Sequence, residues 1–255
     1  MVTHTSSGNG RCSTAAGRYL IVNADDFGQS DGINQGVVKA YERGIVTSAS
    51  LMVRWPTASA AAMYARAHPD LSLGLHIDLG EQIYRSGEWL FLYSVVPMQD
   101  KTAVADEVSR QLVAFRHLVG KDPSHLDSHQ HVHLREPVHS VLLDAAHKLG
   151  VPLRCCSPKV CYRGDFYGQT AEGAPLPDAI SVMALIHILA TLPPGLTELG
   201  CHPGEGIDLY TMYCAEREQE VRVLCDPRIR AAVRAMGIEL RSFQNRPNGQ
   251  SVRKG

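Results

Sequence analysis

Aspartate and histidine side chains recur at four places along the chain, each at the C-terminal end of a predicted strand. These places are Asp25-Asp26, His76, the segment 123–133 and His202. One carboxylate and two imidazoles, with positions left for water, form a suitable ligand set for a catalytic divalent metal ion. Water bound to such an ion is acidic enough to act as a nucleophile near neutral pH. The pattern therefore predicts metal-dependent hydrolysis.

The apolar runs predict the elements that hold these side chains. Runs with strand character alternate with patterns of helical periodicity. Strands are expected at 19–23, 45–53, 71–79, 151–155, 196–201 and 238–243, with a further one inside 123–133. Helices are expected at 32–43, 58–68, 102–119, 137–149 and 178–191, and from Asp226 onward. The predicted fold class is α/β, a single-domain distorted (β/α) barrel of about seven parallel strands.

A barrel would bring all four places to one rim, because its parallel strands end on the same side. Taken singly, each has an ordinary explanation. Asp25-Asp26 could be a turn that caps the next helix, and each histidine could be a hydrogen-bonded structural residue. The convergence of all four places at one rim favours a functional site over these separate structural explanations. Because neighbouring strand side chains point to opposite sides, one aspartate could bind metal while the other accepts a proton.

Length and composition limit the other classes of function. The 255 residues suffice for one large domain, placed at 18–245, with 1–17 as a disordered N-terminal extension and 246–255 as a disordered tail. A formal net charge of −1 argues against nucleic-acid binding, and no stretch approaches a membrane span. Seven cysteines without a C-x-x-C pair suit reduced thiols in a cytoplasmic protein. The oligomeric state stays open, a homo-oligomer included.

Two segments beside the strand ends are expected to be loops. Residues 80–100 carry several aromatic side chains, among them Tyr84 and Trp89, and residues 157–177 are rich in proline, glycine and aromatics. Aromatic faces on such a loop could stack on a sugar ring or could form the loop's own small core. The identity of any substrate would depend on these two segments.

Five motifs resemble the YdjC/ChbG family of carbohydrate deacetylases, in the order in which that family carries them. The motifs are NADDFG at 23–28, GIVTSASLM at 44–52, GLH at 74–76, HLDSHQHVH at 125–133 and CHPG at 201–204. The resemblance implies a distorted (β/α) barrel, one divalent metal ion and the removal of acetyl groups from N-acetylated amino sugars such as chitooligosaccharides. The chemistry would be similar to that of NodB-type polysaccharide deacetylases.

Carried over by motif, the resemblance makes Asp26, His76 and His129 the metal ligands. It makes Asp25 the catalytic base and His202 the general acid or an orienting group. Asp25 would deprotonate the water that attacks the acetyl carbonyl, and His202 would protonate the departing amine. Zinc or magnesium is the expected metal, and cobalt and nickel accept the same ligands.

Several further roles have alternatives. Arg154 could hold the catalytic base or the substrate, and Asp127 could orient a metal-bound imidazole. On a continuing strand His131 and His133 would share a face with His129, and a NodB-like arrangement would pair His129 with His133 as ligands. The candidate substrate-binding residues are Tyr84, Trp89, His131, His133 and Arg154.

Other classes of function fit the sequence less well. An amidohydrolase would carry H-x-H on its first strand, whereas here His129 follows more than a hundred residues. A phosphoesterase would gather more basic residues near the metal. A non-catalytic sugar-binding homologue would lack Asp25 or a metal ligand, and none is missing. Deacetylation of an amino sugar is therefore the expected activity.

Overall fold

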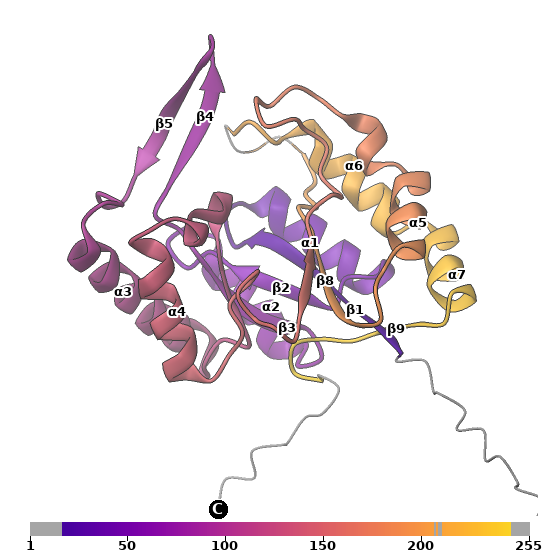
Figure 1. Cartoon of the computed structure of the whole chain (residues 1–255), viewed down its shortest axis with the longest axis horizontal. Helices are drawn as coiled ribbons and strands as arrows, with labels where there is room; N and C mark the ends of the chain where they lie inside the picture. The colour runs from indigo at the N-terminus through magenta and orange to yellow at the C-terminus, as the bar shows by residue number, and fades with distance from the viewer. Residues whose placement is uncertain (1–16, 207, 209–210, 246–255) are drawn as a thin grey trace, which may run out of the picture.

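The computed structural model describes residues 17–206, 208 and 211–245 (Figure 1). Apart from Gly17, the two segments expected to be disordered, 1–17 and 246–255, lie outside the described residues. None of the helices in the described ranges is long and apolar enough to cross a membrane.

Seven strands pair in parallel to form one curled sheet. They are β1 (Arg18–Phe27), β2 (Ser48–Leu51), β3 (Ser72–Ile77), β6 (Leu126–Ser128), β7 (Cys161–Arg163), β8 (Gly195–Cys201) and β9 (Ile238–Leu240). The strand order is β6-β3-β2-β1-β8-β7, and β9 pairs with the first residues of β1. The two end strands, β6 and β7, leave the barrel open between them. The predicted α/β fold with about seven parallel strands in a distorted barrel is confirmed.

Helices cover the outer face of this sheet, with α3 and α4 on one side of Figure 1 and α5, α6 and α7 on the other. The α-helices are α1 (Asp31–Arg43), α2 (Ala58–Ala67), α3 (Lys101–Val119), α4 (Val138–Leu149), α5 (Val182–Ala190), α6 (Ala215–Leu224) and α7 (Pro227–Ala235). Two 3₁₀ helices are η1 (His129–Leu134) and η2 (Pro177–Ile180). Four helices begin with a side chain that accepts a backbone N–H: Ser30, Asp100, Ser181 and Asp226.

The two-residue period of the strands separates an apolar outer face from a polar inner face. In β1, Leu20 and Val22 belong to the main apolar core, whereas Ile21 packs in a small separate cluster. Beyond that cluster the inside of the barrel holds a hydrogen-bonded polar network. Its members are Asn23, Asp25, Ser50, Asp127, Arg154 and Glu198. The strands thus position polar side chains inside the barrel while their other faces hold the fold together.

The segment 80–100, expected to be a loop, instead contains an antiparallel hairpin. β4 (Gly80–Arg85) pairs with β5 (Glu88–Ser94), and both stand out from the body of the molecule in Figure 1. The turn residues Ser86 and Gly87 have φ values of 54° and 90°, as a two-residue hairpin turn requires. The Ser-Gly pair between two runs of strand-forming residues is the signal that the loop prediction overlooked.

The strand expected inside 123–133 ends at Ser128. Gln130 and His131 adopt left-handed φ values of 50° and 51° within η1, which breaks the strand alternation. The expectation that His131 and His133 share a strand face with His129 is therefore wrong.

Three other predictions also need correction. Residues 151–155 form only a single bridge, between Leu126 and Leu153, and not a strand. The predicted helix 178–191 divides into η2 and α5, because the Ser181 side chain caps the second segment. The predicted loop 157–177 contains the short strand β7, and α6 was not predicted at all.

Candidate metal centre and active site

The two adjacent aspartates of β1 serve one site because the strand is irregular between them. Regular alternation would place Asp26 on the opposite face from Asp25. Asp26 has a φ of 64°, and the pairing of β1 with β2 shifts register between Ala24 and Phe27. Both carboxylates consequently line the same cavity, although each residue is at most 2% exposed.

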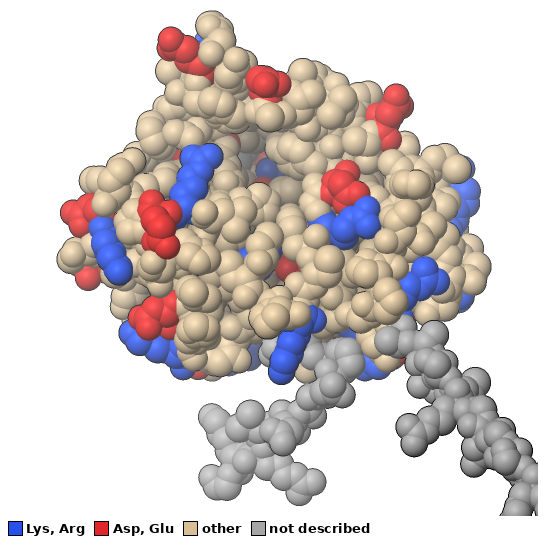
Figure 2. All heavy atoms as spheres, in the orientation of Figure 1, with Lys and Arg blue, Asp and Glu red and all other residues tan. Residues whose placement is uncertain are grey.

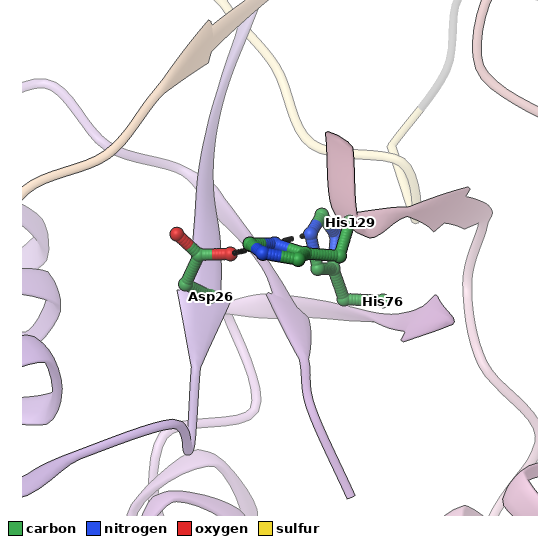
Figure 3. A group of neighbouring side chains, drawn as sticks. All are labelled: Asp26, His76 and His129. Carbon is green, nitrogen blue, oxygen red and sulfur yellow. Dashed lines mark hydrogen bonds and ion pairs between the residues drawn. The ribbon is translucent and has the colours of Figure 1, made fainter. Parts of the chain in front are cut away.

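Asp26, His76 and His129 converge from three separate elements, the end of β1, β3 and the start of η1 (Figure 3). Oδ1 of Asp26 lies 3.3 Å from Nε2 of His76 and 3.1 Å from Nδ1 of His129. All three side chains are buried. The structure therefore brings together the three residues that the motifs assigned as metal ligands.

The chemistry and spacing of these three atoms fit a divalent metal ion. Two donors that each lie about 2.0–2.1 Å from one zinc ion are roughly 3–3.4 Å apart, which matches both measured distances. Oδ2 of Asp26 accepts a 2.7 Å hydrogen bond from Arg217, so Oδ1 is the oxygen left for a metal. Nδ1 of His76 lies 2.8 Å from Asp127, so Nε2 is the nitrogen left for a metal. The predicted role of Asp127 in orienting an imidazole agrees with this contact.

The carboxylates around this cluster stabilise positive charge on its two histidines. Burial would raise the pKa of Asp26, but Arg217 and the two histidines hold it well below its usual range. Burial lowers the pKa of His76, but Asp127 and the neighbouring carboxylates outweigh it and raise the pKa to about 10. Burial also lowers the pKa of His129, but Asp26 and Glu81 outweigh it and raise the pKa to about 9. Without a metal both imidazoles therefore hold an extra proton, which a metal ion bound at this cluster would displace.

A second acidic cluster, Asp25 with Asp127, is paired with Arg154. Nη1 and Nη2 of Arg154 lie 2.5 Å and 2.7 Å from the two oxygens of Asp25. Nη2 also lies 2.8 Å from Oδ2 of Asp127, and Nε lies 2.7 Å from Glu198. Burial raises the pKa of Asp25, but Arg154 outweighs it and keeps the pKa below its usual value. Asp25 is therefore an oriented, ionised carboxylate beside the candidate metal centre.

These side chains lie in a cavity of about 580 Å³ that opens on the face shown in Figure 2. The face is hollowed beneath the hairpin, and charged atoms are visible inside the hollow between mostly uncharged walls. The walls include Gln82 and Trp89 of the hairpin, together with Thr170 and Met212. The hairpin and the segments around residues 170 and 212 thus enclose the space above the metal centre.

His202 faces Asp25 at this cavity. Its Nε2 lies 3.7 Å from Oδ2 of Asp25. The ring packs edge-on against Tyr167 and lies tilted against Tyr213, and these two tyrosines stack on each other with centroids 4.5 Å apart. Burial, only partly offset by Asp25 and Asp26, lowers the pKa of His202 to about 4. The imidazole is therefore held neutral and fixed in orientation.

The candidate substrate-binding residues fall into two groups. Trp89 and His131 line the cavity. Tyr84, His133 and Arg154 are not among its lining residues. Tyr84 packs edge-on against Trp89, with ring centroids 5.5 Å apart. His133 is fully buried, and its Nδ1 is hydrogen bonded to Ser128 at 2.7 Å. Arg154 holds Asp25, which was one of its two expected roles.

Sequence reasoning missed the contribution of α6. Arg217 on this helix binds Asp26, and the buried Glu220 accepts the backbone N–H of His202 and the hydroxyl of Tyr213. The two residues stand three apart, so they share a helix face. The charged run AEREQEVRVL at 215–224 resembles a solvent-exposed helix, and only the fold reveals that two of its charges point inward.

Comparison with known proteins places these features in a family. Residues 19–235 match the family described as YdjC-like protein. A carbohydrate deacetylase of Geobacillus stearothermophilus is 32% identical over 249 residues, covering 89% of this chain and 97% of that protein. A chitooligosaccharide deacetylase of Serratia marcescens is 32% identical over 257 residues, covering 89% and 99% respectively.

A solved structure agrees with this match. It belongs to an Enterococcus faecalis protein to which cleavage of cellobiose phosphate is provisionally ascribed. That structure superposes with a TM-score of 0.75 at 26% identity, over 90% of this chain and 98% of the other. The family match spans most of the chain and contains every residue of the candidate metal centre. The chain belongs to the YdjC-like protein family.

Proposed function

We propose that this protein is a metal-dependent carbohydrate N-deacetylase, which hydrolyses the N-acetyl group of an amino sugar to acetate and a free amine. The observation that carries the proposal is the Asp26–His76–His129 cluster, with the separate carboxylate of Asp25 beside it in one cavity. The names of the two relatives, a carbohydrate deacetylase and a chitooligosaccharide deacetylase, support the same activity. A divalent ion bound by the three residues would supply a Lewis acid for the acetyl carbonyl and lower the pKa of water.

In this proposal Asp25 is the general base. Its carboxylate accepts a proton from the water whose oxygen bonds to the acetyl carbon. Arg154 holds both oxygens of Asp25, which fixes the direction in which it accepts the proton. Arg217 leaves one oxygen of Asp26 free to bind the metal. The guanidinium groups thus separate two adjacent aspartates into a base and a ligand.

His202 completes the proton transfer. When the carbon–nitrogen bond breaks, its electron pair stays on the sugar nitrogen, which must gain a proton to leave as an amine. A histidine with a pKa of about 4 is neutral before turnover, so it must first receive the proton that it delivers. Asp25, 3.7 Å away, is positioned to pass on the proton taken from water. His202 then acts as the general acid.

The cavity walls suit a sugar. Trp89, 48% exposed on the hairpin, presents an aromatic face, and polar side chains such as Gln82 and Thr170 offer hydrogen bonds to hydroxyl groups. We propose that Trp89 and His131 contact the substrate directly. Tyr84 packs against Trp89. Arg154 and His133 do not line the cavity, so their effect on the substrate is indirect.

The metal and the compartment are also proposals. Zinc or magnesium is the expected ion, with cobalt and nickel as alternatives, since all four accept one carboxylate and two imidazoles. Five cysteines of the described ranges, Cys155, Cys156, Cys161, Cys201 and Cys225, carry free thiols, which supports a reducing compartment such as the cytoplasm.

The test is acetate release from a panel of N-acetylated amino sugars and glycosides. The protein is stripped of metal with a chelator and reloaded with each divalent ion in turn. Metal-dependent release of acetate from any member is the expected result, and the fastest substrate identifies the sugar. Absence of release across the panel, with metal demonstrably bound, would contradict the proposed function.

A further inference from the structure

The hairpin contributes one buried acid to the metal centre. Glu81, the second residue of β4, is 2% exposed and lines the cavity. Its Oε2 lies 3.6 Å from Nε2 of His129. Its Oε1 accepts a 2.6 Å hydrogen bond from the hydroxyl of Thr211, which also lines the cavity. Glu81 therefore contacts both a candidate metal ligand and a second residue of the cavity lining.

The local backbone explains why Glu81 points inward. Glu81 pairs with Tyr93, but the next residue, Gln82, pairs with Phe91, so Leu92 is an extra residue in β5. Such a bulge changes the direction of nearby side chains and recurs next to active sites. Tyr93 is itself anchored, because its hydroxyl donates to Asp78 at 2.9 Å. The hairpin is thus built to hold Glu81 against the body of the protein.

His129 needs a partner for one of its two ring nitrogens. Nδ1 faces Asp26 at 3.1 Å, while Nε2 is buried and has no hydrogen-bond partner among the described residues. His76, the neighbouring candidate ligand, has the complementary arrangement. Asp127 binds its Nδ1, and its Nε2 faces Asp26. A movement of about 0.7 Å would bring Glu81 and His129 to hydrogen-bond distance.

We propose that Glu81 is a positioning residue for the metal centre. Its carboxylate accepts the Nε2 proton of His129, which fixes the ring tautomer and leaves Nδ1 as the atom that binds the metal. His76 and His129 would then bind through opposite ring nitrogens, each oriented by its own carboxylate. Glu81 also connects the hairpin that borders the sugar cavity to a metal ligand. The inference rests on the metal centre of the proposed function and not on the identity of the substrate.

The first test is the metal affinity of Glu81→Gln, measured by calorimetric titration of zinc into the stripped full-length protein. Glutamine keeps the size of the side chain and its bond to Thr211 but removes the charged acceptor. We expect zinc affinity to fall about 10- to 100-fold. Glu107→Gln is the matched control, because Glu107 is also buried and hydrogen bonded, to Gln111, but lies on α3 and does not line the cavity. Its zinc affinity should equal that of the wild type.

The second test needs no variant and also covers the case in which Glu81→Gln fails to fold. The tautomer of His129 is read by nitrogen-15 NMR in the zinc-loaded wild type, and the proton is expected on Nε2. A proton on Nδ1, or unchanged zinc affinity in Glu81→Gln, would overturn the role of Glu81, as would a wild type that binds no zinc. A wild type that binds zinc but releases no acetate would refute deacetylation while leaving the tautomer result to decide the role of Glu81.

Discussion

At the scale of single residues, the site depends on giving two adjacent aspartates different partners. Arg154 binds both oxygens of Asp25, whereas Arg217 binds one oxygen of Asp26 and leaves the other facing two histidines. Motifs identified the aspartates, but the alternation of side chains along a regular strand would have placed them on opposite faces. The left-handed backbone of Asp26, which a sequence pattern does not reveal, brings both carboxylates to one cavity.

The two aspartates should respond differently to the same substitution. Asp25→Asn should lower kcat by about 10²- to 10⁴-fold, because the base is lost, while the protein still binds one metal ion. Asp26→Asn should lose both activity and metal, because a carboxylate ligand is removed. Metal content after gel filtration and acetate release measure the two effects. Equal metal loss in both variants would show that Asp25 is also a ligand.

Arg154 should be one of the main determinants of stability inside the barrel. It is fully buried and pairs with Asp25, Asp127 and Glu198. Removal of one partner of such a buried network leaves uncompensated charge, so Arg154→Met should lower the free energy of unfolding by about 3–5 kcal/mol. Arg163→Met removes a half-exposed pair with Asp165 and should cost less than about 1 kcal/mol. Urea unfolding of both variants makes the comparison, and equal losses would contradict it.

At the scale of elements, most of the parallel strands were predictable, whereas the edge strand β7 and the parts that complete the site were less so. Apolar residues, continuous at the start of β1 and interrupted in β3 and β8, identify these strands, which are buried on both faces. The hairpin was mistaken for a loop, since its strands are largely exposed and their aromatic residues resemble a loop core. Helix α6 was missed because Arg217 and Glu220 look like surface charges until the fold buries them.

The hairpin should affect substrate binding more than chemistry. Trp89→Ala removes an aromatic face from the cavity wall, so KM for an N-acetylated oligosaccharide should rise about three- to tenfold, equivalent to about 0.6–1.4 kcal/mol. The value of kcat should stay close to that of the wild type, because Trp89 is not part of the metal centre. Leu90→Ala is the control, since Leu90 is similarly exposed but does not line the cavity. A fall in kcat with KM unchanged would argue against a role for Trp89 as a stacking surface for the sugar.

At the scale of the whole molecule, the polar interior makes the fold sensitive to acid. Burial lowers the pKa of four histidines, to about 3 for His131 and to about 4 for His125, His133 and His202. Between roughly pH 6.5 and pH 4 the unfolded chain therefore binds more protons than the folded protein at these positions. Their contribution to stability is present above pH 6.5 and is lost as the pH falls through this window.

Substitution of His125 tests this pH dependence of stability without removing a candidate metal ligand. Its ring stacks on Phe243 with centroids 3.9 Å apart and is hydrogen bonded to Ser124. The stability advantage of the wild type over His125→Asn should shrink by about 3 kcal/mol between pH 7 and pH 4, since a pKa shift of one unit corresponds to about 1.4 kcal/mol. Urea unfolding at a series of pH values measures it. An advantage that does not change with pH would show that this histidine is not held neutral.

The central claim is that one metal ion at Asp26, His76 and His129 works with Asp25 as base to remove an acetyl group. Its most direct test is to titrate zinc into the stripped protein while acetate release from the best substrate is measured. Activity should rise from near zero and level off at one equivalent of metal. Asp25→Asn should bind the same single equivalent and release almost no acetate. Full activity without metal, or an Asp25→Asn variant as active as the wild type, would contradict this account.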